Sequence, residues 1–171
     1  GLFNRRSFKL QLKRTLAYSR ETQTSVGLLL IDLDHFKHIN DTIGHSAGDH
    51  LLKILSKRFN QCVDHERCSV ARLGGDEFLI IFEGLDEAGA EVVWQRIVAE
   101  FAQINDTENR RYLVSASHGI ETISGGSNEY IDMIINQADE KMYREKKIIK
   151  KDLKIIRDFK PSDENESSPQ D

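Results

Sequence analysis

The stretch ARLGGDEFLIIF, residues 71–82, constrains the fold of this chain more than any other segment. Two short apolar runs, residues 70–73 and 78–82, flank two glycines and two acidic residues. Glycine adopts a positive φ angle at little cost, and apolar runs on both sides of such a turn are typical of a β-hairpin. The stretch therefore predicts two adjacent antiparallel strands joined by a turn. The turn residues are Gly74, Gly75, Asp76 and Glu77.

The rest of the chain alternates between helical and strand-like patterns of apolar residues, without an internal repeat. Asn4 is the expected cap of the first helix, and Ser46 with Asp49 three residues later is the expected start of the second. Residues 34–49 form a polar segment before that second helix. Apolar residues at helical spacing predict helices around residues 8–16, 51–59, 90–101 and 131–142, and further strands are expected at residues 26–33, 112–122 and 153–156.

This order of elements fits an α+β domain with a mainly antiparallel central sheet flanked by helices. The chain has 171 residues, of which 39% are hydrophobic, which suffices for one ordinary globular domain. We expect that domain to cover residues 1–158. The C-terminal tail, residues 159–171, has almost no side chain to bury and is expected to be disordered.

Charge and cysteine content limit the class of protein. The formal net charge of −4 argues against non-specific binding of nucleic acid or of an anionic membrane surface. No apolar run approaches the roughly 18 residues that a membrane span requires. Two cysteines that match no zinc-binding pattern suggest a reduced compartment, so we expect a cytoplasmic domain. The chain begins with Gly1 rather than methionine, which suggests a piece of a longer protein.

Acidic residues gather where two of the predicted strands end. Strand alternation places Asp32 and Asp34 on one face and Leu33 on the other. If this strand pairs with the hairpin, Asp32, Asp76 and Glu77 converge. Two carboxylates ~4 Å apart repel by roughly 4 kcal/mol at an effective dielectric constant of 20, so such a cluster favours a hard cation such as Mg²⁺ or Mn²⁺. The spacing suggests metal-assisted phosphoryl or nucleotidyl transfer, with a solvated acidic turn as the alternative.

Four histidines near this cluster raise the separate question of a zinc site. They are His35, His38, His45 and His50. Their spacing matches no zinc motif, and histidines in polar loops are mostly solvated, so we expect no zinc.

Several motifs in the same order resemble the GGDEF family, the diguanylate cyclases. They are GLFNRRSF at the start, LLLIDLDHFKHINDTIGHSAGDHLL, RLGGDEFLII and ADEKMY, and together the resemblance covers residues 1 to about 158. It implies a palm-like sheet similar to that of nucleotidyl cyclases, with a ferredoxin-like core. It also implies condensation of two GTP molecules into cyclic di-GMP with release of pyrophosphate.

The resemblance assigns metal and catalytic roles to the acidic cluster. It implies two Mg²⁺ or Mn²⁺ ions per active site, held by the carboxylate of Asp32, the backbone carbonyl of Leu33, and Asp76 and Glu77. Two such ions can stabilise both the attacking and the leaving oxygen of an in-line displacement. Either Asp76 or Glu77 could act as the base. Gly74 and Gly75 would let the nucleotide lie against the turn.

The same resemblance places the rest of the nucleotide. Asn40 and Asp49 match positions that hydrogen-bond the guanine edge, although Asp49 also fits a helix-capping acid and Asn40 a turn residue. His45 lines the pocket by resemblance. Lys37 and Lys146 match phosphate-binding positions. Beyond Lys146 the sequence departs from the family, because Ile149 and Lys150 replace a common glycine and arginine.

The resemblance also implies partners and regulation. Catalysis needs a homodimer in which two GTP molecules face each other, and a sensory domain is expected upstream of Gly1. Many family members bind their product through an arginine and an aspartate ahead of the two glycines, but here His65 and Cys68 occupy those positions. We therefore expect weak product inhibition. Two other functions remain open, a non-catalytic receptor for GTP or cyclic di-GMP and a cyclase acting within a single nucleotide.

Overall fold

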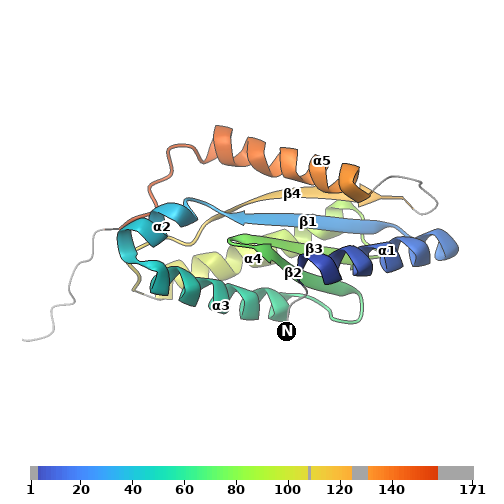
Figure 1. The fold of residues 1–171 in the computed structure, drawn as a ribbon, viewed down its shortest axis with the longest axis horizontal. Helices are drawn as coiled ribbons and strands as arrows, with labels where there is room; N and C mark the ends of the chain where they lie inside the picture. The colour runs from blue at the N-terminus through green and yellow to red at the C-terminus, as the bar shows by residue number, and fades with distance from the viewer. Residues whose placement is uncertain (1–3, 108, 125–130, 158–171) are drawn as a thin grey trace, which may run out of the picture.

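The structure, a computed structural model, describes residues 4–107, 109–124 and 131–157. Its central sheet has four strands in the order β2-β3-β1-β4, and every neighbouring pair is antiparallel (Figure 1). The elements along the chain are α1 (Arg5–Thr22), β1 (Val26–Leu33), α2 (Phe36–Ile43), α3 (His45–Cys62), β2 (Cys68–Gly74), β3 (Glu77–Glu83), α4 (Glu87–Thr107), β4 (Ala116–Ile123), α5 (Ile131–Arg144) and a π-helical turn η1 (Glu145–Ile149).

The topology is that of a ferredoxin-like βαββαβ core, as expected. β1 lies between β3 and β4, and the hairpin β2-β3 returns along its other side. β1 is therefore covered by neighbours on both edges and by helices on both faces. Six of its eight residues form a continuous buried run, which explains why the strand reads as uniformly apolar instead of alternating.

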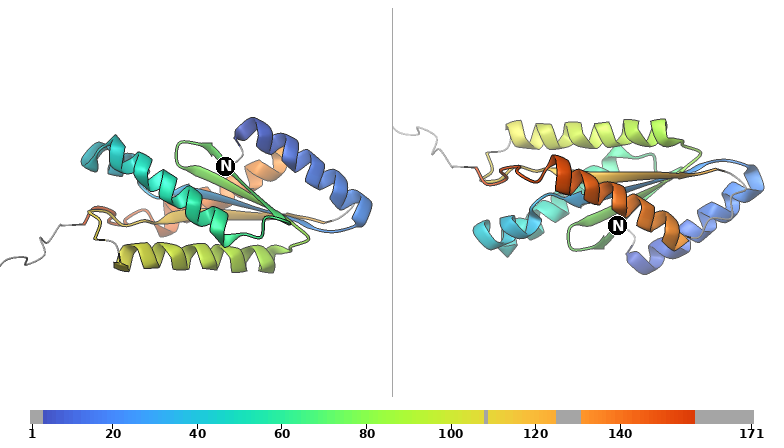
Figure 2. Two further views of the ribbon diagram at one scale, coloured as in Figure 1. Left: turned by 90° about the horizontal axis from the view of Figure 1, so that it is seen from below. Right: turned by 90° about the horizontal axis from the view of Figure 1, so that it is seen from above.

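Helices cover both faces of the sheet and enclose two separate cores (Figure 2). One core packs Leu29, Ile31 and Leu33 of β1 against α2, α3 and α4. The other packs Leu28 and Leu30 of the same strand against α1 and α5. Because the period of a strand is two residues, Asp32 continues the face of Leu28 and Leu30, toward α1 and α5.

The hairpin turn has the backbone that its glycines predict. Gly74 has φ of 145° and Gly75 has φ of 49°, both in the region that glycine tolerates best. The pairing register shifts between Arg72 and Gly74, so the turn carries a bulge. Glu77 is already paired within the sheet, opposite both Gly74 and Asp32.

Four features of local structure differ from the expectations. Residues 36–43, within the segment described as polar, form the helix α2, which was not predicted; its buried residues are Phe36 and Ile39. The helix α3 starts after Gly44, with no side-chain hydrogen bond at its cap, so Ser46 and Asp49 do not form the expected start signal.

The third concerns the C-terminal strand, which is reduced to a single bridge between Tyr112 and Ile156. The fourth concerns the strand predicted at residues 112–122, which begins at Ala116 and ends at Ile123. The predicted tail, residues 159–171, lies outside the described residues. Within the described ranges, no helix is both long and apolar enough to cross a bilayer.

Candidate active site

Backbone pairing brings the predicted acidic residues together at one end of the sheet. Asp32 at the end of β1 lies directly opposite Glu77 at the start of β3. The backbone N–H of Leu33 donates to the carbonyl oxygen of Asp76 over 3.3 Å, which fixes the hairpin turn against β1. The Asp76 side chain lies near enough to that of Asp32 to raise its pKa. Asp32, Asp76 and Glu77 therefore lie at the same end of the sheet, as predicted.

The environment of these carboxyl groups disfavours their charged forms. Burial, followed by the hydrogen bond and the negative charge of Asp76, raises the pKa of Asp32 from 3.8 to about 7, despite the opposing effect of Lys146. Burial, followed by the charge of Asp139, also raises the pKa of Glu77, and Arg5 partly offsets this. A hollow of about 280 Å³ beside Glu77, lined by Arg5 and Asp139 among others, gives access to it between α1 and α5.

Lys146 supplies the positive charge nearest to Asp32. Its ammonium group donates to the backbone carbonyl of Leu33 over 2.9 Å and lies 3.1 Å from Oδ1 of Asp32. It comes from η1, the turn that follows α5. The ammonium therefore lies against two oxygens that the family resemblance assigns to a metal ion.

The donor set fits a magnesium or manganese site shared with a substrate. Asp32 and Asp76 contribute carboxylates and Leu33 a carbonyl, all hard oxygen donors, and a cation already lies among them in the form of Lys146. Among the described residues, no three His, Cys, Asp or Glu side chains form a closed metal cage. Mg²⁺ commonly uses one or two carboxylates together with waters and substrate phosphates, so a closed cage is not required.

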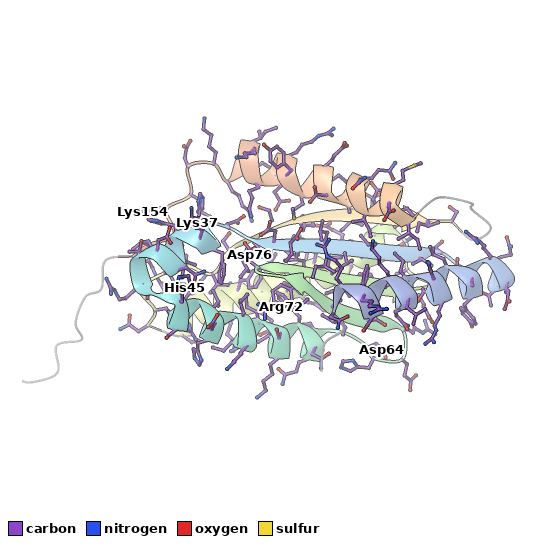
Figure 3. The ribbon with its side chains drawn as sticks, viewed as in Figure 1. Lys37, His45, Asp64, Arg72, Asp76 and Lys154 are labelled. Atoms are coloured by element: carbon purple, nitrogen blue, oxygen red, sulfur yellow. The ribbon has the colours of Figure 1, made fainter. Side chains whose placement is uncertain are left out.

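The residues expected to hold the guanine come from α2 and α3. Asn40 lies on α2, and its side-chain oxygen packs so closely on Gly48 of α3 that a Cβ atom there would come within 1.9 Å of it. Gly48 thus lets the two helices meet at this point. Asp49 follows on the exposed side of α3. Lys37 and His45 are exposed at the same end of the molecule, toward which Asp76 also lies (Figure 3).

Lys150 lies in a different environment from the one expected. Its ammonium group lies 3.1 Å from Oδ2 of Asp34 and 3.5 Å from Glu145, and it donates to the carbonyl of Ala116. Asp34 is only 1% exposed and also accepts hydrogen bonds from the hydroxyls of Ser115 and Ser117, each over 2.6 Å. Lys150 therefore neutralises a buried carboxylate in this structure.

Sequence reasoning did not assign a role to Asp34. The one sequence feature that pointed to Asp34 was its position at the end of the strand, two residues after Asp32. Its hydrogen-bond and ion-pair partners lie far along the chain and could not be predicted; they are Ser115, Ser117 and Lys150.

The positions of the family's inhibitory site lie far from this cluster. His65 is exposed in the turn after α3, and Cys68 begins β2. Asp64, which precedes His65, lies toward the end of the molecule opposite His45 (Figure 3). Burial raises the pKa of the Cys68 thiol to about 11, so it is a neutral thiol and offers no carboxylate-like acceptor.

Comparison with known proteins decides the family. The family profile described as "Diguanylate cyclase, GGDEF domain" matches residues 1–152. The chain belongs to the GGDEF family. Diguanylate cyclases of this family act on GTP, generally use divalent metal ions and are typically parts of multidomain sensory proteins.

Curated relatives include more than one kind of GGDEF-containing protein. A probable diguanylate cyclase, DgcE of Escherichia coli, is 35% identical over 149 residues, which are 85% of this chain and 13% of that protein. A cyclic di-GMP phosphodiesterase, NbdA of Pseudomonas aeruginosa, is 30% identical over 136 residues, 80% of this chain and 17% of that protein. The chain thus spans less than a fifth of either relative.

Solved structures of GGDEF domains share the fold. The active GGEEF domain of a diguanylate cyclase from Vibrio cholerae superposes with a TM-score of 0.77 at 28% identity, covering 86% of this chain and 92% of that one. The sheet order and the placement of helices on both faces are therefore those of the GGDEF family.

Proposed function

We propose that this domain is a diguanylate cyclase that condenses two GTP molecules into cyclic di-GMP. The convergence of Asp32, Asp76 and Glu77 beside the Leu33 carbonyl carries the proposal, because it provides hard oxygen ligands at the turn that gives the family its name. The glycines and acids of that turn are intact, which favours catalysis over a receptor that only binds nucleotides.

The proposed reaction consists of two equivalent displacements. In each, the 3′-hydroxyl oxygen of one GTP attacks the α-phosphorus of the other, a new P–O bond forms, and the bond to pyrophosphate breaks. Two divalent ions, when bound at this site, lower the pKa of the hydroxyl and neutralise charge on the phosphates. The hydroxyl proton leaves to solvent or to a carboxylate, for which Asp76 and Glu77 are the candidates.

The residues of this chain hold and orient the substrate. Asn40 and Asp49 form hydrogen bonds with the guanine edge. The carboxylate of Asp49 accepts from the two N–H donors that guanine presents and adenine lacks. Lys37 and Lys146 contact phosphates. We assign Lys150 to Asp34 instead of a phosphate, because its ammonium lies 3.1 Å from that buried carboxylate; this departs from the role that the family resemblance suggested. Each domain holds one GTP, so a two-fold pair of domains completes the reaction.

Substitution of the turn acids tests this proposal. Asp76→Asn and Glu77→Gln should each lower the rate of cyclic di-GMP formation by about a hundredfold or more, since a lost transition-state charge interaction costs several kcal/mol. Asp106→Asn is the matched control, because Asp106 is an exposed carboxylate on α4 that does not line the hollow beside Glu77. Rates within a few-fold of wild type for both turn variants would refute the assignment. A wild-type protein that binds GTP without turnover would instead support a receptor.

A further inference from the structure

Lys146 makes the contacts that a bound cation would make. Its ammonium nitrogen lies 2.9 Å from the Leu33 carbonyl oxygen and 3.1 Å from Oδ1 of Asp32. The Lys146 side chain is 26% exposed and that of Asp32 is 18% exposed, so water screens the pair only in part. These are two of the oxygens to which the proposed function assigns a divalent ion.

An ammonium and a divalent ion compete for such a position. Mg²⁺ lies about 2.0–2.1 Å from its oxygen ligands, so an ion on Asp32 and Leu33 would stand next to a positive charge that contacts the same oxygens. Like charges at that separation in a partly buried site repel strongly. Metal binding therefore disfavours the observed position of the ammonium.

We propose that Lys146 is the built-in counter-ion of the metal-free site, which divalent ions must displace. This inference rests on the proposed function, because it takes Asp32 and Leu33 as metal ligands. In the metal-free protein the ammonium stabilises the buried carboxylate and holds β1 to the end of α5. Once displaced, the same ammonium is available for the triphosphate, so metal binding and phosphate binding assist each other.

The surroundings of Lys146 allow the exchange without unfolding. Lys146 lies in the five-residue turn η1, whose neighbours Lys147, Ile148 and Ile149 are exposed. Lys150 anchors the end of that turn through the buried Asp34. The four-carbon side chain of Lys146 can thus change rotamer while the backbone stays in place.

The preceding helix, α5, offers a matched control. The ammonium of Lys141 donates to the Ile120 carbonyl over 2.8 Å and lies 2.8 Å from Oε1 of Glu121, the same combination of one carbonyl and one carboxylate. Glu121 and Ile120 lie on β4, away from the acidic end of β1, and are assigned to no ligand. Removing Lys141 therefore deletes an equivalent contact without changing the proposed metal site.

The test is a titration of nucleotide-free protein with Mn²⁺ alone. The free ion is measured by its electron paramagnetic resonance signal. Lys146→Met should bind Mn²⁺ about tenfold more tightly than wild type, equivalent to about 1.4 kcal/mol. Lys141→Met should match wild type. Adding Asp32→Asn to Lys146→Met should abolish the gain. Lys146→Gln provides a second, polar variant in case the methionine perturbs folding.

Thermal unfolding gives an independent readout. In the presence of a chelator, Lys146→Met should melt below wild type, and Mn²⁺ should raise its melting temperature more than that of wild type. Equal Mn²⁺ affinity in wild type and both Lys146 variants would overturn the inference and leave the proposed function standing. A gain that survives Asp32→Asn would overturn it as well. No Mn²⁺ binding by any variant would overturn the metal site and this inference together.

Discussion

Asp32→Asn should stabilise the metal-free domain at pH 8 while it removes a proposed metal ligand. The pKa of Asp32 is raised in the folded protein to about 7, from 3.8 as the ordinary value. Between about pH 4 and pH 7, therefore, this carboxyl group is protonated in the folded state and ionised in the unfolded state. Stability must fall as the pH rises through that window, and the full cost is present above it.

The size of the effect follows from the same shift. A rise of about three pKa units corresponds to about 4 kcal/mol at 1.36 kcal/mol per unit. The group is partly solvated, so screening reduces this to about 1–2 kcal/mol. The attraction of Lys146 is already included, since it opposes the shift. For a domain of this size, that stabilisation raises the melting temperature by about 3–6 °C.

The assay is thermal or urea unfolding of wild type and Asp32→Asn in a chelating buffer at a series of pH values. The variant should be more stable at pH 8, and its advantage should shrink steadily toward pH 4. Asp106→Asn, which changes an exposed carboxylate on α4, should show no such trend. An Asn variant that is less stable than wild type at pH 8, or an advantage independent of pH, would refute the reasoning about burial.

Three further predictions concern nucleotide choice, assembly and regulation. Asp49→Ser should weaken discrimination between GTP and ATP, because an acceptor facing the guanine donors is lost; an unchanged preference in direct competition would make Asp49 no part of base recognition. Specific activity should rise with protein concentration as dimers form, and a flat profile while sedimentation shows a changing monomer fraction would reject a two-domain reaction. Cyclic di-GMP should bind weakly in calorimetric titrations, and progress curves should show no early arrest, because His65 and Cys68 provide neither the guanidinium fork nor the carboxylate; tight binding lost on substituting both would show the opposite.

The strands and long helices could be predicted because their signals are local. The run of residues 26–33, the glycines of the hairpin turn and the helical spacing in α4 and α5 each follow from a few neighbouring residues. The placement of Asp32 near the hairpin acids also followed once the strand and the hairpin were assumed to be neighbours, and the structure pairs Asp32 with Glu77. That assumption is the only long-range step, and the sheet order bears it out.

Short elements and long-range ion pairs could not be predicted in the same way. The helix α2 has eight residues with only Phe36 and Ile39 buried, too few for a clear helical period. The contact of Lys150 with Asp34 joins residues far apart in the chain, and nothing around either one marks the pair. Lys150 in place of the family's arginine suggested a weakened phosphate contact. In the structure, Lys150 instead forms an ion pair with the buried carboxylate of Asp34.

The most direct test of the account is the product formed from GTP and Mg²⁺ by the purified chain at high protein concentration, identified by mass spectrometry. If the domain is a diguanylate cyclase, one cyclic di-GMP forms for every two pyrophosphates released, and Asp76→Asn measured in parallel forms none. Formation of a cyclic mononucleotide instead, or no turnover of bound GTP by a folded and dimeric wild-type protein, would contradict it.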